Sequence, residues 1–202
     1  MYIDRTLKEY FDDLAAKRPA PGGGSASAAV AATGTSLMRM VANFTAGKPE
    51  YGEVQDKVAR ISEEALKLDS RFRALIDDDV MAYEKLASAL KGRKAGEAVP
   101  ESLYKDALKP PFEVCELTGK AMKLCRELVE CGNKKLITDT AIAAILFEAA
   151  FFSAKFNVYV NLRFVKDTDH IAGIHRVVTA LEESMPKVKE EILELCEDVI
   201  SS

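Results

Sequence analysis

The segment IDDDVMAYEKL (76–86) holds the residue with the clearest capacity for chemistry. Apolar residues recur at every third or fourth position through this region, which is typical of a seam between antiparallel helices, and Asp79 falls on that seam. The same spacing predicts that Asp77 and Asp78 face water. A carboxylate on a packed face must accept hydrogen bonds, meet a cation or raise its pKa to stay neutral. Asp79 is therefore a candidate general acid or base, and the alternatives are a solvated side chain or a cap on a neighbouring helix.

A second candidate carboxylate, Asp139, lies in GNKKLITDTAIAA (132–144). The apolar pattern predicts a helix over residues 136–165, so Asp139 falls in its first turn. A negative charge there complements the helix dipole, and capping alone accounts for an aspartate at this position. A catalytic role is the competing hypothesis.

Two asparagines in FNVYVNL, Asn157 and Asn161, are four residues apart and share one face of the same predicted helix. Asn157 is eighteen residues beyond Asp139, which returns to the same side of the helix about 27 Å further along its axis. Asp139 and Asn157 therefore face the same way but cannot both touch one small reacting group. Hydrogen bonds between packed helices are the alternative role for the asparagines. Lys155 and Glu148 point away from this face and are expected to lie outward.

A glycine-rich loop, PAPGGGSASAA (19–29), precedes a run of very small residues. Glycines at the start of a helix let the backbone approach a ligand closely, and the free N–H groups there favour an anion. Gly22, Gly23, Gly24 and Ser25 are therefore candidates for binding a carboxylate or a phosphate. The loop is neither a Walker A loop nor a dinucleotide fingerprint, because it has no GK[ST] and no preceding strand. A tight turn without a ligand is the alternative.

The elements that must position these residues are helices, because strand patterns are almost absent. Apolar periodicity and breaker residues predict six helices, at about residues 6–17, 24–46, 53–90, 101–131, 136–165 and 169 to the C-terminus. A polar loop is expected at 91–100. Thr6 and Glu9 form a possible capping box for the first helix, whose apolar stripe is Leu7, Phe11 and Leu14.

Two of the six predicted helices are mostly apolar and are expected to be central. The helix at 24–46 carries one charge, Arg39, and the helix at 136–165 is rich in alanine. Small residues make the first too weakly apolar for a membrane span and suit it to close packing. Pro110 and Pro111 must kink or restart the fourth helix. We expect an all-α fold, one domain over 1–202, with two central small-residue helices surrounded by four amphipathic ones.

The overall composition excludes several classes of function. The net charge of −4 and the pI near 5.4 argue against a nucleic-acid surface. No signal peptide is recognisable, so a cytoplasmic location is expected, without membrane contact. The four cysteines have no CxxC spacing and the two histidines are five residues apart, so we expect reduced core thiols and no metal site.

Five segments occur here in the order and spacing of a known family. They are PAPGGGSASA, MVANFTAGKPEY, LIDDDVMAYEKL, GNKKLITDTAIAA and FNVYVNL. Together they resemble the cyclodeaminase/cyclohydrolase family, which forms the C-terminal half of formiminotransferase-cyclodeaminase and also occurs as separate bacterial enzymes. The resemblance covers nearly the whole chain. It implies an all-helical homodimer that acts on one-carbon tetrahydrofolates with no metal or nucleotide cofactor.

The resemblance also implies roles for individual residues. The family's acidic motif falls on Asp79, Ala82 and Tyr83, and its second aspartate falls on Asp139. Lys135, Leu136 and Thr138 differ from the family's usual residues at those positions. Asp79 and Asp139 are the implied catalytic residues. The implied substrate-binding residues are Gly22, Gly23, Gly24, Ser25, Tyr83, Asn133 and Asn157. Because folates also carry glutamate carboxylates, Lys48 and Lys134 are expected, on their charge, to anchor those carboxylates or pterin edges.

The implied chemistry is either of two related reactions. Members of the family cyclise 5-formiminotetrahydrofolate with release of ammonia, or open 5,10-methenyltetrahydrofolate to the 10-formyl compound. Both reactions pass through a tetrahedral carbon between N5 and N10, and both need a proton acceptor and donor beside it. We expect Asp79 or Asp139 to be that group. A non-catalytic or diverged helical folate-binding or interaction module is the alternative, but it does not explain the glycine loop or an aspartate in the helix seam.

Overall fold

The computed structural model describes residues 1–94 and 97–202, and two residues of the polar loop expected at 91–100 lie outside the described residues. Its six α-helices are α1 (Leu7–Ala15), α2 (Gly23–Thr45), α3 (Gln55–Gly92), α4 (Glu101–Cys131), α5 (Ile137–Leu162) and α6 (Thr168–Ser201). Short 3-10 helices lie at Tyr2–Asp4, Pro49–Val54 and Lys134–Leu136, and the described residues form no strand. The predicted all-α fold and its six helices are confirmed.

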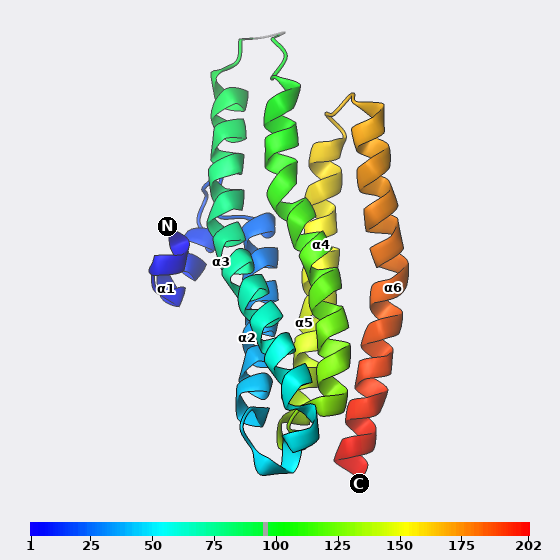
Figure 1. Ribbon diagram of the computed structural model, residues 1–202. Helices are drawn as coiled ribbons and strands as arrows, with labels where there is room; N and C mark the ends of the chain where they lie inside the picture. The colour runs from blue at the N-terminus through cyan, green and yellow to red at the C-terminus, as the bar shows by residue number, and fades with distance from the viewer. Residues whose placement is uncertain (95–96) are drawn as a thin grey trace.

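Local signals explain where several helices begin and end. The Thr6 side chain accepts a hydrogen bond from the amide of Glu9, whose carboxylate accepts one from the amide of Thr6, so the predicted capping box is present. Gly132 ends α4. The helix α4 runs through Pro110 and Pro111 without restarting, and it bends in its first half (Figure 1).

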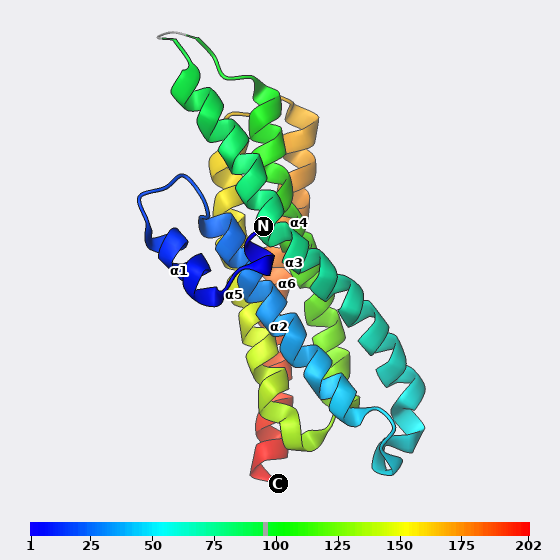
Figure 2. The ribbon, with the colours of Figure 1, turned by 90° about the vertical axis from the view of Figure 1, so that its left-hand side faces the viewer.

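The long helices form one bundle in which α2 and α5 run antiparallel, side by side (Figures 1 and 2). The helix α2 packs on α3, α4 and α5, and α5 packs on α2, α4 and α6. Gly34 permits the close approach of α2 to α5, because a Cβ there would lie 3.0 Å from the Phe147 ring. The helices α3, α4 and α5 extend beyond the first residue of α2, which therefore begins partway along the bundle (Figure 1).

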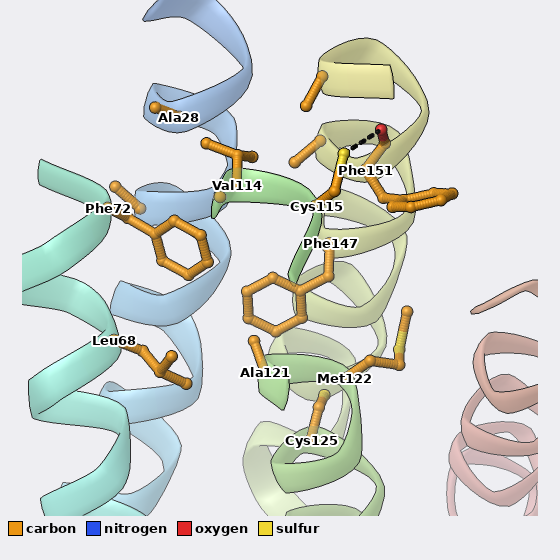
Figure 3. Packing of buried hydrophobic residues seen from close by; sticks show 14 of the residues in the cluster. Ala28, Leu68, Phe72, Val114, Cys115, Ala121, Met122, Cys125, Phe147 and Phe151 are labelled. Carbon is orange, nitrogen blue, oxygen red and sulfur yellow. Dashed lines mark hydrogen bonds between the residues drawn. The ribbon is translucent and has the colours of Figure 1, made fainter. Parts of the chain in front are cut away.

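The core between these helices is closely packed and contains the cysteines. Phe72 of α3 and Phe147 of α5 are fully buried, with Val114 and Cys115 of α4 beside them (Figure 3). The Cys115 thiol donates to the carbonyl of Phe151. All four cysteines are buried and free, as expected, and burial raises their pKa values, so they are poor nucleophiles.

The first helix packs with a different side from the one its sequence predicts. Leu7 and Phe11 are 74% and 59% exposed, whereas Tyr10 is buried. The prediction that the stripe of Leu7, Phe11 and Leu14 faces the core is wrong for the first two residues. Tyr10 fixes the orientation, because its hydroxyl lies 3.2 Å from Oγ of Ser25 at the start of α2.

One side of the two central helices remains uncovered. We call it the α2–α5 outer face; it consists of Val30, Leu37, Met40 and Phe44 of α2 and Ile142, Ile145, Ala149, Ser153, Phe156 and Val160 of α5. Phe156 is 70% exposed. The segment Lys134–Leu162 is long and apolar enough to cross a membrane by length and composition, but in this fold it packs against three other helices.

The opposite side of α5 faces α6 through two ion pairs. Lys155 lies 2.5 Å from Glu182, and Glu148 lies 3.3 Å from Lys189. The expectation that Lys155 and Glu148 point outward to water is therefore wrong. Their positions opposite the asparagine face were predicted correctly, but α6 occupies that side.

Candidate active site

Asp79 of α3 meets the glycine loop at the first turn of α2. The amide of Ser25 donates a 2.8 Å hydrogen bond to Oδ2 of Asp79. A Cβ on Gly24 would lie 2.1 Å from Oδ1 of Asp79, so only glycine leaves room for the carboxylate there. The alternative role predicted for Asp79, a cap on a neighbouring helix, is therefore confirmed, because its carboxylate accepts a hydrogen bond from a free N–H group in the first turn of α2. The same contact fixes the position of the carboxylate.

A hollow of about 250 Å³ opens beside this contact, above the first residue of α2. It is bordered by α2, α3, α4 and α5, because α2 begins partway along the bundle and leaves the other three helices to form the walls (Figure 1). Its lining residues are Ala20, Gly22, Gly23, Gly24, Asp79, Tyr83, Ala107, Asn157, Val160 and Asn161. A small polar ligand in this hollow meets one carboxylate, two amide side chains and a phenol.

The electrostatics of the hollow favour a proton-transfer role for Asp79. Burial raises its pKa to about 6, and the hydrogen bond from Ser25 opposes that rise. No lysine or arginine lines the hollow among the described residues, so no cation there holds the carboxylate ionised. A carboxyl group that titrates near neutral pH can both accept and return a proton.

The two asparagines predicted to share a face both line the hollow. Nδ2 of Asn157 donates to the carbonyl of Ser153, and Nδ2 of Asn161 donates to the carbonyls of Asn157 and Ala107. Both N–H groups of Asn161 and one of Asn157 are therefore engaged by helix carbonyls. The side-chain oxygens remain to accept hydrogen bonds from a ligand, and the second N–H group of Asn157 remains to donate one. A Cβ on Gly23 would lie 3.2 Å from Nδ2 of Asn157, so this glycine also permits a close approach.

Two residues outside the predicted set, Asp77 and Tyr10, support the site from behind. Asp77 is only 3% exposed and accepts hydrogen bonds from the amides of Tyr2 and Ile3 at 2.5 and 3.2 Å. The prediction that Asp77 faces water is wrong, because the N-terminal 3-10 helix covers it. Tyr10 holds Ser25 from the same side. No local sequence pattern predicts either contact, because each joins residues that are far apart in the sequence.

The other predicted site residues lie at the opposite end of α2. Asn133 is buried, its amide donates to Oγ1 of Thr45, and its Nδ2 donates to the carbonyl of Phe44. Asn133 therefore ties the α4–α5 connection to the end of α2. Asp139 is half-buried in the first turn of α5, as predicted.

Lys48 and Lys134 lie in the connections at this same end. The Lys48 carbonyl accepts from the amide of Tyr51, whose hydroxyl accepts from the amide of Lys134. A second hollow of about 320 Å³, bordered by Lys134 among other residues, lies beside this contact. The predicted residues thus form two groups. The pocket group is Gly22, Gly23, Gly24, Ser25, Asp79, Tyr83 and Asn157, and the α5-start group is Lys48, Asn133, Lys134 and Asp139.

Known proteins resemble this chain over most of its length. The sequence model of the formiminotransferase-cyclodeaminase family matches residues 6–180. A methenyltetrahydrofolate cyclohydrolase from Methylorubrum extorquens is 32% identical over 171 residues, which are 81% of this chain and 82% of that protein. A formimidoyltransferase-cyclodeaminase from Rattus norvegicus is 29% identical over 90% of this chain, which spans 35% of that longer protein. The crystal structure of a formiminotetrahydrofolate cyclodeaminase from Thermotoga maritima has a TM-score of 0.90 and 30% identity, covering 99% of this chain and 100% of the other.

Proposed function

This chain belongs to the formiminotransferase-cyclodeaminase family, and from that membership we propose that it is a one-carbon folate enzyme acting at the carbon that bridges N5 and N10 of tetrahydrofolate. The reaction is either the opening of 5,10-methenyltetrahydrofolate by water or the cyclisation of 5-formiminotetrahydrofolate with loss of ammonia. One or the other of these activities appears in the names of its relatives. We assign the active site to this hollow because the buried carboxylate of Asp79 lines it.

In the hydrolytic direction, water attacks the cationic methenyl carbon and gives a proton to the Asp79 carboxylate. The tetrahedral carbon then collapses, its bond to N5 breaks, and N5 takes the proton from Asp79. The hydroxyl proton passes to solvent as the formyl group forms on N10. The negative carboxylate also stabilises the cationic carbon before attack, because the hollow is only partly solvated.

In the deaminating direction, N10 attacks the carbon of the protonated formimino group, whose nitrogen becomes an amino group, and N10 loses its proton to the Asp79 carboxylate. The amino group on the tetrahedral carbon takes that proton and leaves as ammonia, and the methenyl cation forms. Both directions need one group that accepts and then returns a proton, which a carboxyl group with a pKa of about 6 can do. Proton transfers suffice for every step, so the proposal includes no metal or other cofactor.

The remaining pocket residues orient the substrate. The oxygens of Asn157 and Asn161 can accept from the N–H groups of a pterin, and Tyr83 borders the same hollow. Pockets that enclose whole drug-sized ligands measure roughly 300–1,000 Å³. A hollow of about 250 Å³ therefore suits the reacting ring system and leaves the rest of the folate outside.

We also propose that the protein forms a homodimer and is cytoplasmic. The α2–α5 outer face is an apolar surface of the kind that marks a protein interface, which supports a homodimer. Four buried free cysteines suit a reducing compartment, which supports a cytoplasmic location. The net charge of −4 speaks against nucleic acid as a partner.

Turnover of both folates by the purified protein tests the proposal. The near-ultraviolet absorbance of 5,10-methenyltetrahydrofolate should fall faster than its uncatalysed rate, or 5-formiminotetrahydrofolate should release ammonia. Asp79→Asn should lower the activity that is found by a factor of about 100 or more. Asp78→Asn is the matched control, because Asp78 is the next residue of α3 and pairs with Arg71 outside the hollow. If the protein turns over neither substrate but folate raises its thermal unfolding midpoint, the non-catalytic folate-binding module is favoured instead.

A further inference from the structure

Two consecutive prolines interrupt the backbone hydrogen bonds of α4. Pro110 and Pro111 lie inside this helix, and both are buried. A proline has no N–H group, so it removes the hydrogen bond to the carbonyl four residues earlier. Pro111 therefore leaves the carbonyl of Ala107 without its α-helical donor. Pro110 removes the donor three residues on, which would satisfy the same carbonyl in a 3-10 turn. Ala107 is the one residue of α4 whose two local donors are both replaced by prolines.

The carbonyl of Ala107 lies beside the hollow that contains Asp79. Ala107 is one of the residues that line this hollow. A proline ring inside a helix also clashes with the carbonyl four residues earlier, which bends the helix. The helix α4 bends in its first half (Figure 1). Pro111 therefore both removes the local donor and displaces the Ala107 carbonyl from the hydrogen-bond ladder of α4.

Asn161 of α5 meets this carbonyl at long range. Its Nδ2 donates to the Ala107 oxygen at 3.4 Å, whereas N–H···O hydrogen bonds in proteins are usually about 2.9–3.0 Å long. The same Nδ2 also donates to the carbonyl of Asn157 at 3.0 Å. A carbonyl oxygen has two lone pairs, so the Ala107 oxygen retains capacity for a further donor. Ala107 is only 4% exposed, so bulk water has little access and the further donor must come from the contents of the hollow.

We propose that the main-chain carbonyl of Ala107 binds the substrate by accepting a hydrogen bond from the 2-amino group of the pterin. The inference deepens the proposed folate activity and rests on it for the identity of the ligand. An amino group that projects from the edge of a ring can reach a carbonyl recessed in a helix backbone. The alanine side chain is small enough to leave that approach open. The Ala107 carbonyl is then a specificity-determining group that the prolines of α4 create.

A second acceptor beside this carbonyl suits the same amino group. Both N–H groups of Asn161 are engaged by helix carbonyls, so its Oδ1 is the atom that it offers to a ligand. Oδ1 belongs to the same amide as the Nδ2 that contacts Ala107, so the two acceptors lie side by side. An amino group carries two N–H groups and can donate one to each acceptor.

This arrangement also orients the pterin relative to Asp79. Asp79 enters the hollow from α3, against the first turn of α2, whereas Ala107 and Asn161 border it from α4 and α5. The 2-amino group is on the pyrimidine ring of a tetrahydropterin, and N5 is on the other ring. A pterin held by its amino group at α4 and α5 therefore directs N5, and the carbon that reacts there, toward the Asp79 carboxylate.

Binding of two ligands to the wild-type protein tests the proposal without turnover. The ligands are tetrahydrofolate and its analogue with a methyl group in place of the 2-amino group. Calorimetric titration without oxygen gives the dissociation constant of each. The wild-type protein should bind tetrahydrofolate at least about tenfold more tightly, because the methyl group leaves two buried acceptors unpaired. Equal affinities for the two ligands would overturn the proposal.

Pro111→Ala tests the origin of the free carbonyl. Alanine restores an N–H group that bonds to the carbonyl of Ala107 within the helix, so this acceptor becomes occupied. The preference for tetrahydrofolate over the methyl analogue should fall by about threefold or more, because one of two hydrogen bonds is lost. The substrate KM should rise with little change in kcat, as expected for a group that binds the ground state and the transition state alike. The thermal unfolding midpoint should not fall, since alanine is the better helix former.

Pro186→Ala is the matched control, because Pro186 also lies inside a long helix, α6, and does not line the hollow. It should keep the wild-type preference and KM. A wild-type preference in Pro111→Ala would mean that the prolines only bend α4, and it would overturn the role of the carbonyl. If Pro111→Ala does not fold, the wild-type affinities for the two ligands still decide.

The two ligands also separate this inference from the proposed function. A wild-type protein that shows the expected preference but turns over neither folate retains the carbonyl site and loses the proposed activity. A protein that turns over a folate but binds the two ligands equally retains the activity and loses the carbonyl site. A wild-type protein that binds no tetrahydrofolate overturns both.

Discussion

The backbone amide of Ser25 donates a 2.8 Å hydrogen bond to Oδ2 of Asp79 across 54 residues of sequence. This bond joins the first turn of α2 to the middle of α3 and holds a carboxylate at the edge of the hollow. Three consecutive glycines precede Ser25, and the third of them leaves the space that the carboxylate occupies. The glycine loop and Asp79 therefore form a single structural unit. Substitutions in the loop and at Asp79 both test it.

A methyl group on the glycine loop should move the carboxylate. In Gly24→Ala the new Cβ would lie 2.1 Å from Oδ1 of Asp79, so the side chain must rotate and lose the bond from Ser25. We expect kcat/KM to fall by about tenfold to a hundredfold, because the proton acceptor leaves its position. The free energy of unfolding should change by less than about 1–2 kcal/mol, since alanine favours the helix and the carboxylate is free to turn.

Gly173→Ala is the control for this substitution. Gly173 lies in α6, and a Cβ there meets no atom within 4 Å. It should leave kcat/KM unchanged in the same absorbance assay. Wild-type kcat/KM in Gly24→Ala would argue against a fixed position of the Asp79 carboxylate in the reaction.

Neutralising Asp79 should stabilise the folded protein at neutral pH. The folded state raises the pKa of Asp79 from 3.8 to about 6, so between these values the folded state binds more protons than the unfolded state. Stability from this group is complete below about pH 4 and is lost as the pH rises to about 6. A shift of this size corresponds to as much as about 3 kcal/mol. Asp79→Asn should therefore be more stable than wild type at pH 7.5, with the difference vanishing near pH 4.

Urea unfolding at the two pH values measures this difference. If Asp79 served only as an ionised cap on α2, Asp79→Asn would instead be the less stable protein at pH 7.5. The experiment thus separates a desolvated functional carboxylate from a structural one without any assay of turnover.

The pH dependence of kcat/KM should show the ionisation of Asp79. If Asp79 must be ionised to accept a proton, kcat/KM rises with pH and reaches half of its plateau near pH 6. The residual rate of Asp79→Asn should lack this step, because asparagine does not titrate in the range. Rates from pH 5 to 8, corrected for the uncatalysed reaction at each pH, give the profile. A wild-type profile that is flat through pH 6 contradicts Asp79 as the base.

The buried carboxylate of Asp69 should matter for stability rather than for turnover. It accepts from Arg39 at 2.5 Å, from Arg73 at 3.0 Å and from Ser36 at 3.3 Å, and it is 3% exposed. Asp69→Asn leaves two guanidinium groups without their anion between α2 and α3. We expect a loss of about 2–4 kcal/mol in the free energy of unfolding, measured by urea denaturation.

Glu63→Gln is the matched control, because the Glu63–Lys67 pair is also on α3 but is exposed. Its loss should be much smaller than that of Asp69→Asn, because water screens an exposed ion pair. Equal losses in the two variants would contradict a special role for the buried carboxylate of Asp69.

The sequence was informative wherever the deciding interaction is local. The stripe of α3 recurs with the helical period, so it placed Leu68, Phe72 and Leu75 in the core, and all three are buried. It also singled out Asp79, which lines the hollow. The same periodicity failed for Asp77, because the groups that bury it are the amides of Tyr2 and Ile3, more than seventy residues away. Likewise an amphipathic pattern identified α1 as a helix but did not reveal that Tyr10, rather than Phe11, anchors it.

By itself the sequence determined the six helices, the capping box, the glycine loop and the spacing of Asp139 and Asn157 along α5. These features depend on hydrogen bonds and side-chain positions within a few turns of one helix, which local residue types govern. Only the tertiary structure decided that Ser25 meets Asp79, that Lys155 turns to α6 and that the predicted site residues divide between two ends of the bundle. Those pairings depend on which helix faces pack together. The pairing of helix faces depends on the whole core, because each face is buried only when the neighbouring helices are in place.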